Sequence, residues 1–269
     1  MTPSSSGTAA VHGKCRSDPK HLISSGRYPV TQRENALSPH RYARVGGVLY
    51  LIIIATAMFA EAFVRGNLIV SGNAAATAAN IVGSQSLFRW GLAADLLNCV
   101  IDVVVATILY TLLRPINRLL ALLAAFLRIA ADAILGLTGI FQMAAIIILG
   151  GGETLKVFEP QQLQSLAYLS MSLHGEGYGI SLIFFGLGCE VLGYLIYQSG
   201  YLPRAIGMLL MIAGAGYLFN SFAGIVAPPL AASAFPWTLL PGFVAELALT
   251  FWLLIKGVHL PSWEARVQV

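Results

Sequence analysis

Six long apolar runs dominate this sequence and constrain its fold more than any other feature. A bilayer hydrocarbon core of about 30 Å needs about 20 residues of helix to cross it, and each run reaches that length. They cover approximately residues 45–64, 87–113, 119–149, 166–197, 205–226 and 237–258. The runs are continuous, whereas a strand of a membrane barrel alternates in polarity and spans only about 9–11 residues. We therefore predict an all-α, polytopic membrane bundle of six transmembrane helices.

Composition agrees with a membrane protein and excludes several classes of soluble protein. Of the 269 residues, 57% are hydrophobic and only 10% are charged, whereas a soluble domain has roughly 25% charged residues. Cys15, Cys99 and Cys189 lie too far apart to suggest a disulfide framework or a zinc site. The sequence contains no phosphate-binding glycine loop, nucleophile elbow or nucleic-acid module. We expect no cofactor, no metal and no nucleic-acid partner, and we assign no catalytic residue. A non-enzymatic role is favoured.

The chain divides near residue 41. Residues 1–40 are rich in Ser, Pro, His, Lys and Arg, and such a segment buries too little apolar surface to offset the entropy of ordering. We predict a disordered cytoplasmic tail over 1–40, a six-span domain over 41–260 and a cytoplasmic C-terminal tail over 261–269. The first apolar run begins too far from the N-terminus for a typical signal peptide, so we interpret it as an uncleaved span.

The distribution of Lys and Arg predicts the orientation. One side of the predicted bundle carries most of the basic residues: Arg41, Arg44, Arg114, Arg118, Arg204, Lys256 and Arg266. The opposite side carries only Arg65, Arg89 and Lys156 near the ends of the spans. Because basic loops remain cytoplasmic, both termini are predicted in the cytoplasm. The Ala-rich loop over 66–86, on the other side, is a candidate interfacial helix.

Several motifs together resemble one known family. They are Arg44-Val-Gly-Gly-Val-Leu-Tyr50, Glu61-Ala-Phe-Val-Arg65, Asn73-Ala-Ala-Ala-Thr77, Leu87-Phe-Arg89, Asp95 with Asp102, Leu112-Leu-Arg-Pro-Ile-Asn-Arg118, His174 with Gly177-Tyr178, Phe184-Phe-Gly186, and Gly193-Tyr-Leu-Ile with Ser199-Gly-Tyr-Leu-Pro-Arg204. In this order, over about residues 41–258, they resemble the bacterial membrane-protein family called domain of unknown function 4386. The resemblance implies a six-span protein of the bacterial inner membrane and implies no activity.

Charged side chains within the apolar runs are the main functional signal, because each costs about 2.5–3.5 kcal/mol to insert into a membrane. Asp95 and Asp102 share one helical face in the second run, and Arg128 and Asp132 share one in the third. Counting from the turn between these runs places Asp102 and Arg128 at similar depth, about 15–18 Å in, so we predict that they pair. Asp95 and Asp132 would then meet in the outer half, with a proton, a cation or Arg89 between them.

The acids outnumber the bases at membrane depth. Glu190 and Glu246 join Asp95, Asp102 and Asp132, whereas Arg128 is the one base assigned to this depth. Five acids cannot all be ionised in hydrocarbon beside one arginine. The sequence therefore predicts protonated acids, a water-filled cavity or a bound cation.

His174, near Glu176 at the outer start of the fourth run, leaves two interpretations open. It could cap a helix at the interface, or it could join carboxylates from other spans around a metal, as an intramembrane hydrolase would require. We retain it among the candidate residues for binding or for a proton or cation relay. The full set is Asp95, Asp102, Arg128, Asp132, His174 and Glu246.

Three functional hypotheses follow. In the first, the protein binds or moves a small solute, cation or proton through its polar centre, with Asp102 and Arg128 as gate or relay and Asp95 and Glu246 as acceptors. In the second, it is a non-catalytic scaffold whose buried charges only specify helix pairing, with a membrane-protein partner. In the third, it is an intramembrane metalloenzyme acting on lipid.

Glycines in the fourth and fifth runs predict close helix packing. Gly175, Gly179, Gly186 and Gly193 form a stripe of small residues in the fourth run, and Gly207, Gly214 and Gly216 lie in the fifth. Small residues allow helix backbones to approach closely in membranes. We therefore expect other helices to approach each of these two helices closely at its glycines.

Overall fold

The structure, a computed structural model, describes residues 38–267. The predicted N-terminal tail over 1–40 lies outside the described residues, except for 38–40, which begin the first helix. The described part is helical and contains no strand. This confirms the all-α class.

The helices follow the six apolar runs closely. A continuous helix comprises α1 (Pro39–Met58), the π-helical segment η2 (Phe59–Arg65) and α2 (Gly66–Leu68). The short α3 (Ala74–Gly83) precedes three long helices, α4 (Gln85–Leu113), α5 (Arg118–Leu149) and α6 (Pro160–Ser199), with the turn η3 (Glu153–Leu155) between α5 and α6. The chain ends with α7 (Arg204–Val226), α8 (Pro228–Ala234), α9 (Leu240–Ile255) and α10 (Leu260–Val267).

Local sequence signals explain where these helices begin and end. The Ser38 side chain accepts a hydrogen bond from the Arg41 backbone N–H at the start of α1, and Pro39 occupies the first turn. Asn117 caps α5 in the same way, accepting from the Leu120 N–H at 3.0 Å. Gly200, with φ of +74°, ends α6 in a left-handed conformation that suits glycine. These caps fix the turns at one end of the bundle.

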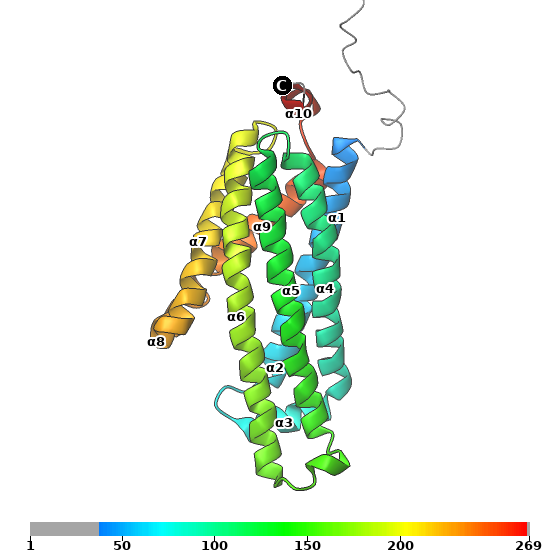
Figure 1. The fold of residues 1–269 in the computed structure, drawn as a ribbon, viewed down its shortest axis with the longest axis vertical. Helices are drawn as coiled ribbons and strands as arrows, with labels where there is room; N and C mark the ends of the chain where they lie inside the picture. The colour runs from blue at the N-terminus through cyan, green and yellow to red at the C-terminus, as the bar shows by residue number, and fades with distance from the viewer. Residues whose placement is uncertain (1–37, 268–269) are drawn as a thin grey trace, which may run out of the picture. The chain divides into compact units, whose positions relative to one another are not determined.

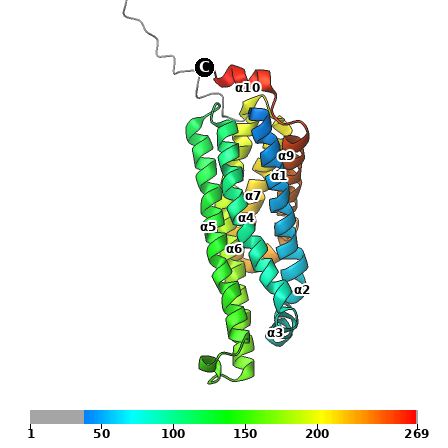
Figure 2. The same ribbon diagram turned by 90° about the vertical axis from the view of Figure 1, so that its right-hand side faces the viewer.

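Six helices form a closed ring. In order, α1 packs against α4, α4 against α5, α5 against α6, α6 against α7, α7 against α9, and α9 returns to α1. Figures 1 and 2 show α4, α5 and α6 side by side, with α1 and α9 on the other face. The Ala-rich loop over 66–86 forms a helix, as predicted. This helix is α3, and it packs against α6. A ring of this kind leaves an interior that side chains from all six helices can reach.

Five helices are long and apolar enough to cross a membrane: Pro39–Leu68, Gln85–Leu113, Arg118–Leu149, Pro160–Ser199 and Arg204–Val226. The sixth predicted span is shorter than expected. We predicted helix from residue 237, but α9 begins at Leu240, because Pro236 and Pro241 confine residues 235–239 to a turn. With 16 residues, α9 reaches the length of a span only together with α10, and the two are bent by 95°.

The bend places α10 across the end of the ring. Residues 261–267 belong to the predicted C-terminal tail, yet they form helix, and the Trp263 indole donates to the Leu112 carbonyl oxygen at 3.1 Å. Tyr201, in the turn between α6 and α7, donates to the same carbonyl at 2.7 Å. Helix α4 ends in this region, so both side chains satisfy a carbonyl that has no partner within the helix.

The glycine stripe is only partly a packing surface. Gly193 and Gly207 meet so closely that a Cβ on either would lie 2.6 Å from the backbone oxygen of the other, and Gly186 and Gly214 meet in the same manner. Gly175 and Gly179 have no such neighbour within 4 Å. The predicted close approach of another helix is therefore confirmed at Gly186 and Gly193, where that helix is α7, and is wrong for Gly175 and Gly179.

Candidate functional site

A cavity of about 290 Å³ lies inside the ring. All six ring helices line it, and most of the lining is apolar or aromatic. Its polar wall consists of five carboxyl groups, two guanidinium groups, an amide and a few hydroxyl groups. The ionisable members are Glu61, Asp95, Asp102, Asp132, Glu246, Arg65 and Arg128. Four of the five acids and one of the two arginines are residues that the sequence marked as candidates.

Arg128 and Asp102 form the predicted pair at the centre. Arg128 donates through Nη2 to Asp102 Oδ1 at 2.6 Å and through Nε to Oδ2 at 2.9 Å, so the contact is bidentate. The guanidinium carbon lies 4.9 Å from the ring centroid of Tyr50 and 5.0 Å from that of Phe185. Arg128 is 4% exposed and Asp102 is 2% exposed. The arginine is thus held by a carboxylate and two aromatic rings, the arrangement expected of a desolvated guanidinium.

Asp132 lies one helical turn from Arg128 on α5, and its carboxyl lies beside that of Asp102. Its Oδ2 atom is buried and has no hydrogen-bond partner among the described residues. Arg128 pairs with only one of these two adjacent carboxyl groups, Asp102, so a second negative charge on Asp132 needs a proton or a cation.

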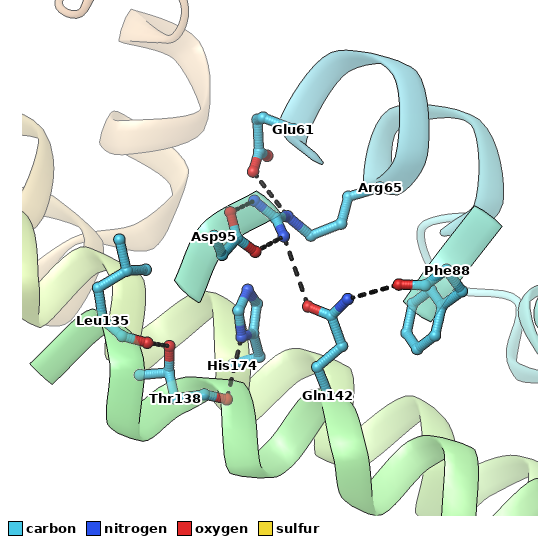
Figure 3. A network of polar contacts seen from close by, with 8 residues as sticks. All are labelled: Glu61, Arg65, Phe88, Asp95, Leu135, Thr138, Gln142 and His174. Carbon is cyan, nitrogen blue, oxygen red and sulfur yellow. Dashed lines mark hydrogen bonds and ion pairs between the residues drawn. The ribbon is translucent and has the colours of Figure 1, made fainter. Parts of the chain in front are cut away.

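A second charged cluster surrounds Arg65 (Figure 3). Arg65 donates to Asp95 through Nη1 at 2.5 Å and through Nη2 at 3.3 Å, and its Nε donates to Glu61 at 2.8 Å. The expectation that Asp95 meets Asp132 across a proton, a cation or Arg89 is therefore wrong. Arg65 is the partner of Asp95, and Arg89 is exposed.

Arg65 was assigned to the end of a span, but it is only 8% exposed. Two features bring its side chain inward. The π-helical segment η2 widens the helix locally over residues 59–65. Gln142 on α5 connects Arg65 to the Phe88 carbonyl. Its Oε1 accepts a hydrogen bond from Arg65 at 3.4 Å, and its amide nitrogen donates to the Phe88 oxygen at 3.2 Å.

Glu190 and Glu246, the two glutamates predicted at membrane depth, differ in whether they line the cavity. Glu246 on α9 lines the cavity and accepts a hydrogen bond from the Tyr217 hydroxyl at 2.7 Å. Glu190 on α6 is not among the cavity residues, and its side chain lies beside Gly214 of α7. Glu190 therefore does not belong with the other four acids, although its depth suggested that it did.

His174 occupies a buried position next to the Arg65 cluster (Figure 3) and does not line the cavity. Its Nδ1 donates to the Thr138 carbonyl oxygen at 3.1 Å, and the residue is 3% exposed. Within residues 38–267, no three His, Cys, Asp or Glu side chains come together as a metal ion would require. The convergence that an intramembrane metalloenzyme needs around His174 is thus not observed in this part of the chain.

Sequence reasoning missed Glu61, Arg65, Gln142 and the cavity tyrosines. Glu61 and Arg65 had a signal that was available, since an acid and a base at i and i+4 share a helical face. The depth count failed for Arg65 because the first helix extends past the predicted end at residue 64 to Leu68. Gln142 and the tyrosines carry no signal of their own, since uncharged side chains are common in apolar helices.

The cavity combines excess negative charge with an apolar wall. Carboxyl groups outnumber guanidinium groups by three among its lining residues, and the two arginines are each engaged by a carboxylate. Among the acids of the cavity, Asp132 and Glu246 have no arginine contact within residues 38–267. Chemically, such a site can accept protons or hold a small positively charged solute.

Comparison with known proteins agrees with the resemblance seen in the motifs. The family model described as "Domain of unknown function (DUF4386)" matches residues 45–257. An uncharacterized protein of Archaeoglobus fulgidus is 31% identical over 159 residues, which is 59% of this chain and 78% of that protein. This relative is archaeal, so it does not support the bacterial origin that the resemblance implied. No solved structure matches the chain. The chain belongs to the family of the domain of unknown function DUF4386.

Proposed function

We propose that this protein binds a small cationic solute or protons in its central cavity and carries them across the cytoplasmic, or inner, membrane of a prokaryotic cell. The single observation that carries the proposal is the cavity of about 290 Å³ in which five carboxyl groups face only two guanidinium groups. A charged group at membrane depth is costly, and a bundle that only needed to hold together would not require this excess.

Within the proposal, the roles of the acids differ from our first assignment. Asp102 and Arg128 remain a gate or relay because they form a closed pair in the middle of the cavity wall. Asp95 is engaged by Arg65, so it is a poor acceptor. Asp132 and Glu246 take that role, since neither has an arginine partner in the part of the chain that the structure describes.

In the proposed orientation, the N-terminus and the C-terminus both lie in the cytoplasm. Arg41, Arg44, Arg114, Arg118, Arg204, Lys256 and Arg266 are all exposed, and they lie where helices begin or end on one side of the ring. With Arg65 buried, Arg89 and Lys156 are the exposed basic residues of the other side in the part of the chain that the structure describes. The asymmetry thus becomes stronger than the sequence suggested, which favours the basic end as the cytoplasmic one.

Transport by purified protein tests the proposal. The full chain is reconstituted into proteoliposomes, and proton movement and the uptake of small labelled cations are followed with an imposed gradient. We expect flux above that of empty liposomes, reduced at least about tenfold in the Asp132→Asn and Glu246→Gln variants. Glu190→Gln, an acid of the same bundle outside the cavity, should retain the flux. Absence of both binding and flux in well-folded protein would contradict the proposal.

A second candidate function is supported by the closed geometry of the Arg128–Asp102 pair. A bidentate pair between two aromatic rings would suit a scaffold in which buried charges specify helix pairing. In that case the exchanged double variant Arg128→Asp, Asp102→Arg should restore both folded yield and cellular phenotype. Restored yield without flux would instead favour the transport proposal.

A further inference from the structure

Two carboxyl groups of the cavity, those of Asp132 and Glu246, have no arginine partner among the described residues. Asp132 lines the cavity, and the residue is 9% exposed. Its Oδ2 atom has no hydrogen-bond partner among the described residues. The Glu246 carboxyl also lines the cavity and is held by the Tyr217 hydroxyl rather than by a base. A buried anionic oxygen without a partner is costly. At each of these two positions a proton or a positively charged hydrogen-bond donor can balance the carboxyl group, and the cavity has room for such a donor.

Bare metal ions fit this requirement poorly. Calcium takes 6–8 oxygen ligands and magnesium takes an octahedral set, so several oxygens must converge on one point. In the described part of the chain no three acidic, histidine or cysteine side chains converge in that way. The acids are instead distributed around the wall, on η2, α4, α5 and α9.

The size and the wall of the cavity favour an organic ion. A volume of about 290 Å³ is roughly twice that of the engineered protein cavity of about 150 Å³ that holds benzene. Four aromatic side chains line it: Tyr178, Phe185, Tyr217 and Phe243. A hydrated inorganic ion would make few favourable contacts with such a wall. An ammonium ion with an apolar body would gain dispersion contacts and cation–π attraction from it.

The protein already contains an example of this recognition at the same wall. The Arg128 side chain is an organic cation held by a carboxylate and by two aromatic rings at 4.9 and 5.0 Å. Phe185, one of those rings, also packs edge-on against Tyr217 at a centroid distance of 5.5 Å. The hydroxyl of Tyr217 in turn holds Glu246. The aromatic wall thus continues from a bound guanidinium to an acid that has no basic partner.

We propose that the ligand of this cavity is a small organic ammonium ion whose N–H groups bind Asp132 and whose apolar body packs against the aromatic side chains of the wall, while Glu246 adds to the negative potential of the cavity. The inference rests on the proposed function, because it names the class of cation that the central cavity takes. Recognition by Asp132 requires a positively charged donor, and recognition by the aromatic wall requires an apolar group of roughly the size of a single ring.

Binding to the purified full chain in lipid nanodiscs tests the inference. Benzylammonium is titrated at pH 7, where a primary amine carries its proton, and benzyl alcohol serves as the neutral compound of the same shape. We expect saturable binding of benzylammonium and no competition from an equal concentration of benzyl alcohol. Asp132→Asn should weaken binding at least about tenfold, and Glu190→Gln should leave it within about twofold. Phe243→Leu should weaken binding more than Phe219→Leu, which changes an exposed ring outside the cavity lining.

The other outcomes separate this inference from the proposed function. Saturable binding of potassium or magnesium, or proton flux that depends on Asp132, without any binding of benzylammonium, would overturn the inference and leave the proposed function standing. Equal binding of benzylammonium and benzyl alcohol would also overturn it, because the charge would then play no part. No ligand binding and no flux in folded protein would overturn both. Folding of each variant is checked by its thermal unfolding before titration.

Discussion

Two arginine clusters line the same cavity, and they differ in what surrounds the guanidinium. Arg128 is enclosed by Asp102, Tyr50 and Phe185, and the side chains of the ion pair are only 5% and 3% exposed. Arg65 is shared between Asp95 and Glu61, and the Glu61 side chain is 61% exposed. One cluster is therefore an ion pair whose two side chains are almost fully buried in the cavity wall, whereas the other includes an acid that water reaches.

Asp132 lies next to the Arg128–Asp102 pair, but neither residue of the pair supplies a hydrogen bond to its Oδ2 atom. Arg128 directs its contacts to Asp102 and Tyr50, which leaves Asp132 Oδ2 without a partner in the described part of the chain. Stability should therefore depend on the arginines, and ligand binding on the acids that the arginines do not reach.

The largest effect is expected from Arg128→Met. It leaves the Asp102 carboxylate buried without its partner, which typically costs about 3–5 kcal/mol. Thermal unfolding of the purified protein should show a strongly lowered midpoint or a loss of folded yield. The double variant Arg128→Met, Asp102→Leu should recover most of the loss, since no charge remains unpaired. A single variant as stable as the native chain would show that the pair is not structural.

A smaller loss is expected from Arg65→Met. Glu61 can turn to water, and Gln142 stays bonded to the Phe88 carbonyl, so mainly Asp95 is left unsatisfied, at about 1–3 kcal/mol. The same unfolding measurement checks this value. Arg89→Met, at an exposed position on α4, is the matched control and should change stability by no more than about 0.5 kcal/mol. A loss as large as that of Arg128→Met would remove the distinction between the two clusters.

Asp132→Asn should separate stability from binding. Replacing an acid that has no basic partner removes a costly buried charge, so we expect the unfolding free energy to stay within about 1 kcal/mol or to rise. Binding of benzylammonium in the same preparation should fall at least about tenfold. Strong destabilisation with unchanged binding would reverse the roles assigned to Asp132 and Arg128.

The smallest effect is expected from Glu61→Gln. An exposed ion pair contributes about 0–1 kcal/mol, and Arg65 keeps its contacts with Asp95. Unfolding at low and at high salt should give nearly the same midpoint for this variant and the native chain. Asp95→Asn, which removes the buried acid of the same cluster, should be clearly more damaging, and equal effects of the two changes would argue that Glu61 is not solvated.

The sequence predicted the architecture better than the site. Apolar run lengths located the ends of the five long helices to within six residues, because burial in lipid leaves little freedom in where a helix can end. The Asp102–Arg128 pair was predicted from depth alone, since a short turn fixes the register of the two helices that it joins. These inferences depend on local sequence and on one connection.

The parts that failed depend on contacts between distant segments. Arg65 turns inward through a π-helical segment and a contact with Gln142, 77 residues further along the chain. Glu190 is excluded from the cavity by the rotation of α6 about its axis, which depth does not reveal. The shortness of α9 follows from Pro236 and Pro241, which hold residues 235–239 in a turn before the helix begins. Helix rotation and local helix geometry, rather than depth, decide which acids meet.

Accessibility of position 132 tests the central claim most directly. In a chain whose three native cysteines are replaced by alanine, Asp132→Cys is treated with small thiol reagents of the same size, one positively and one negatively charged, with and without benzylammonium. The account predicts labelling that is markedly faster with the positive reagent, because Glu246 and the other acids still face the cavity, and that benzylammonium slows. Equal rates for the two reagents, or no labelling of folded protein, would contradict an acidic cavity that admits cations.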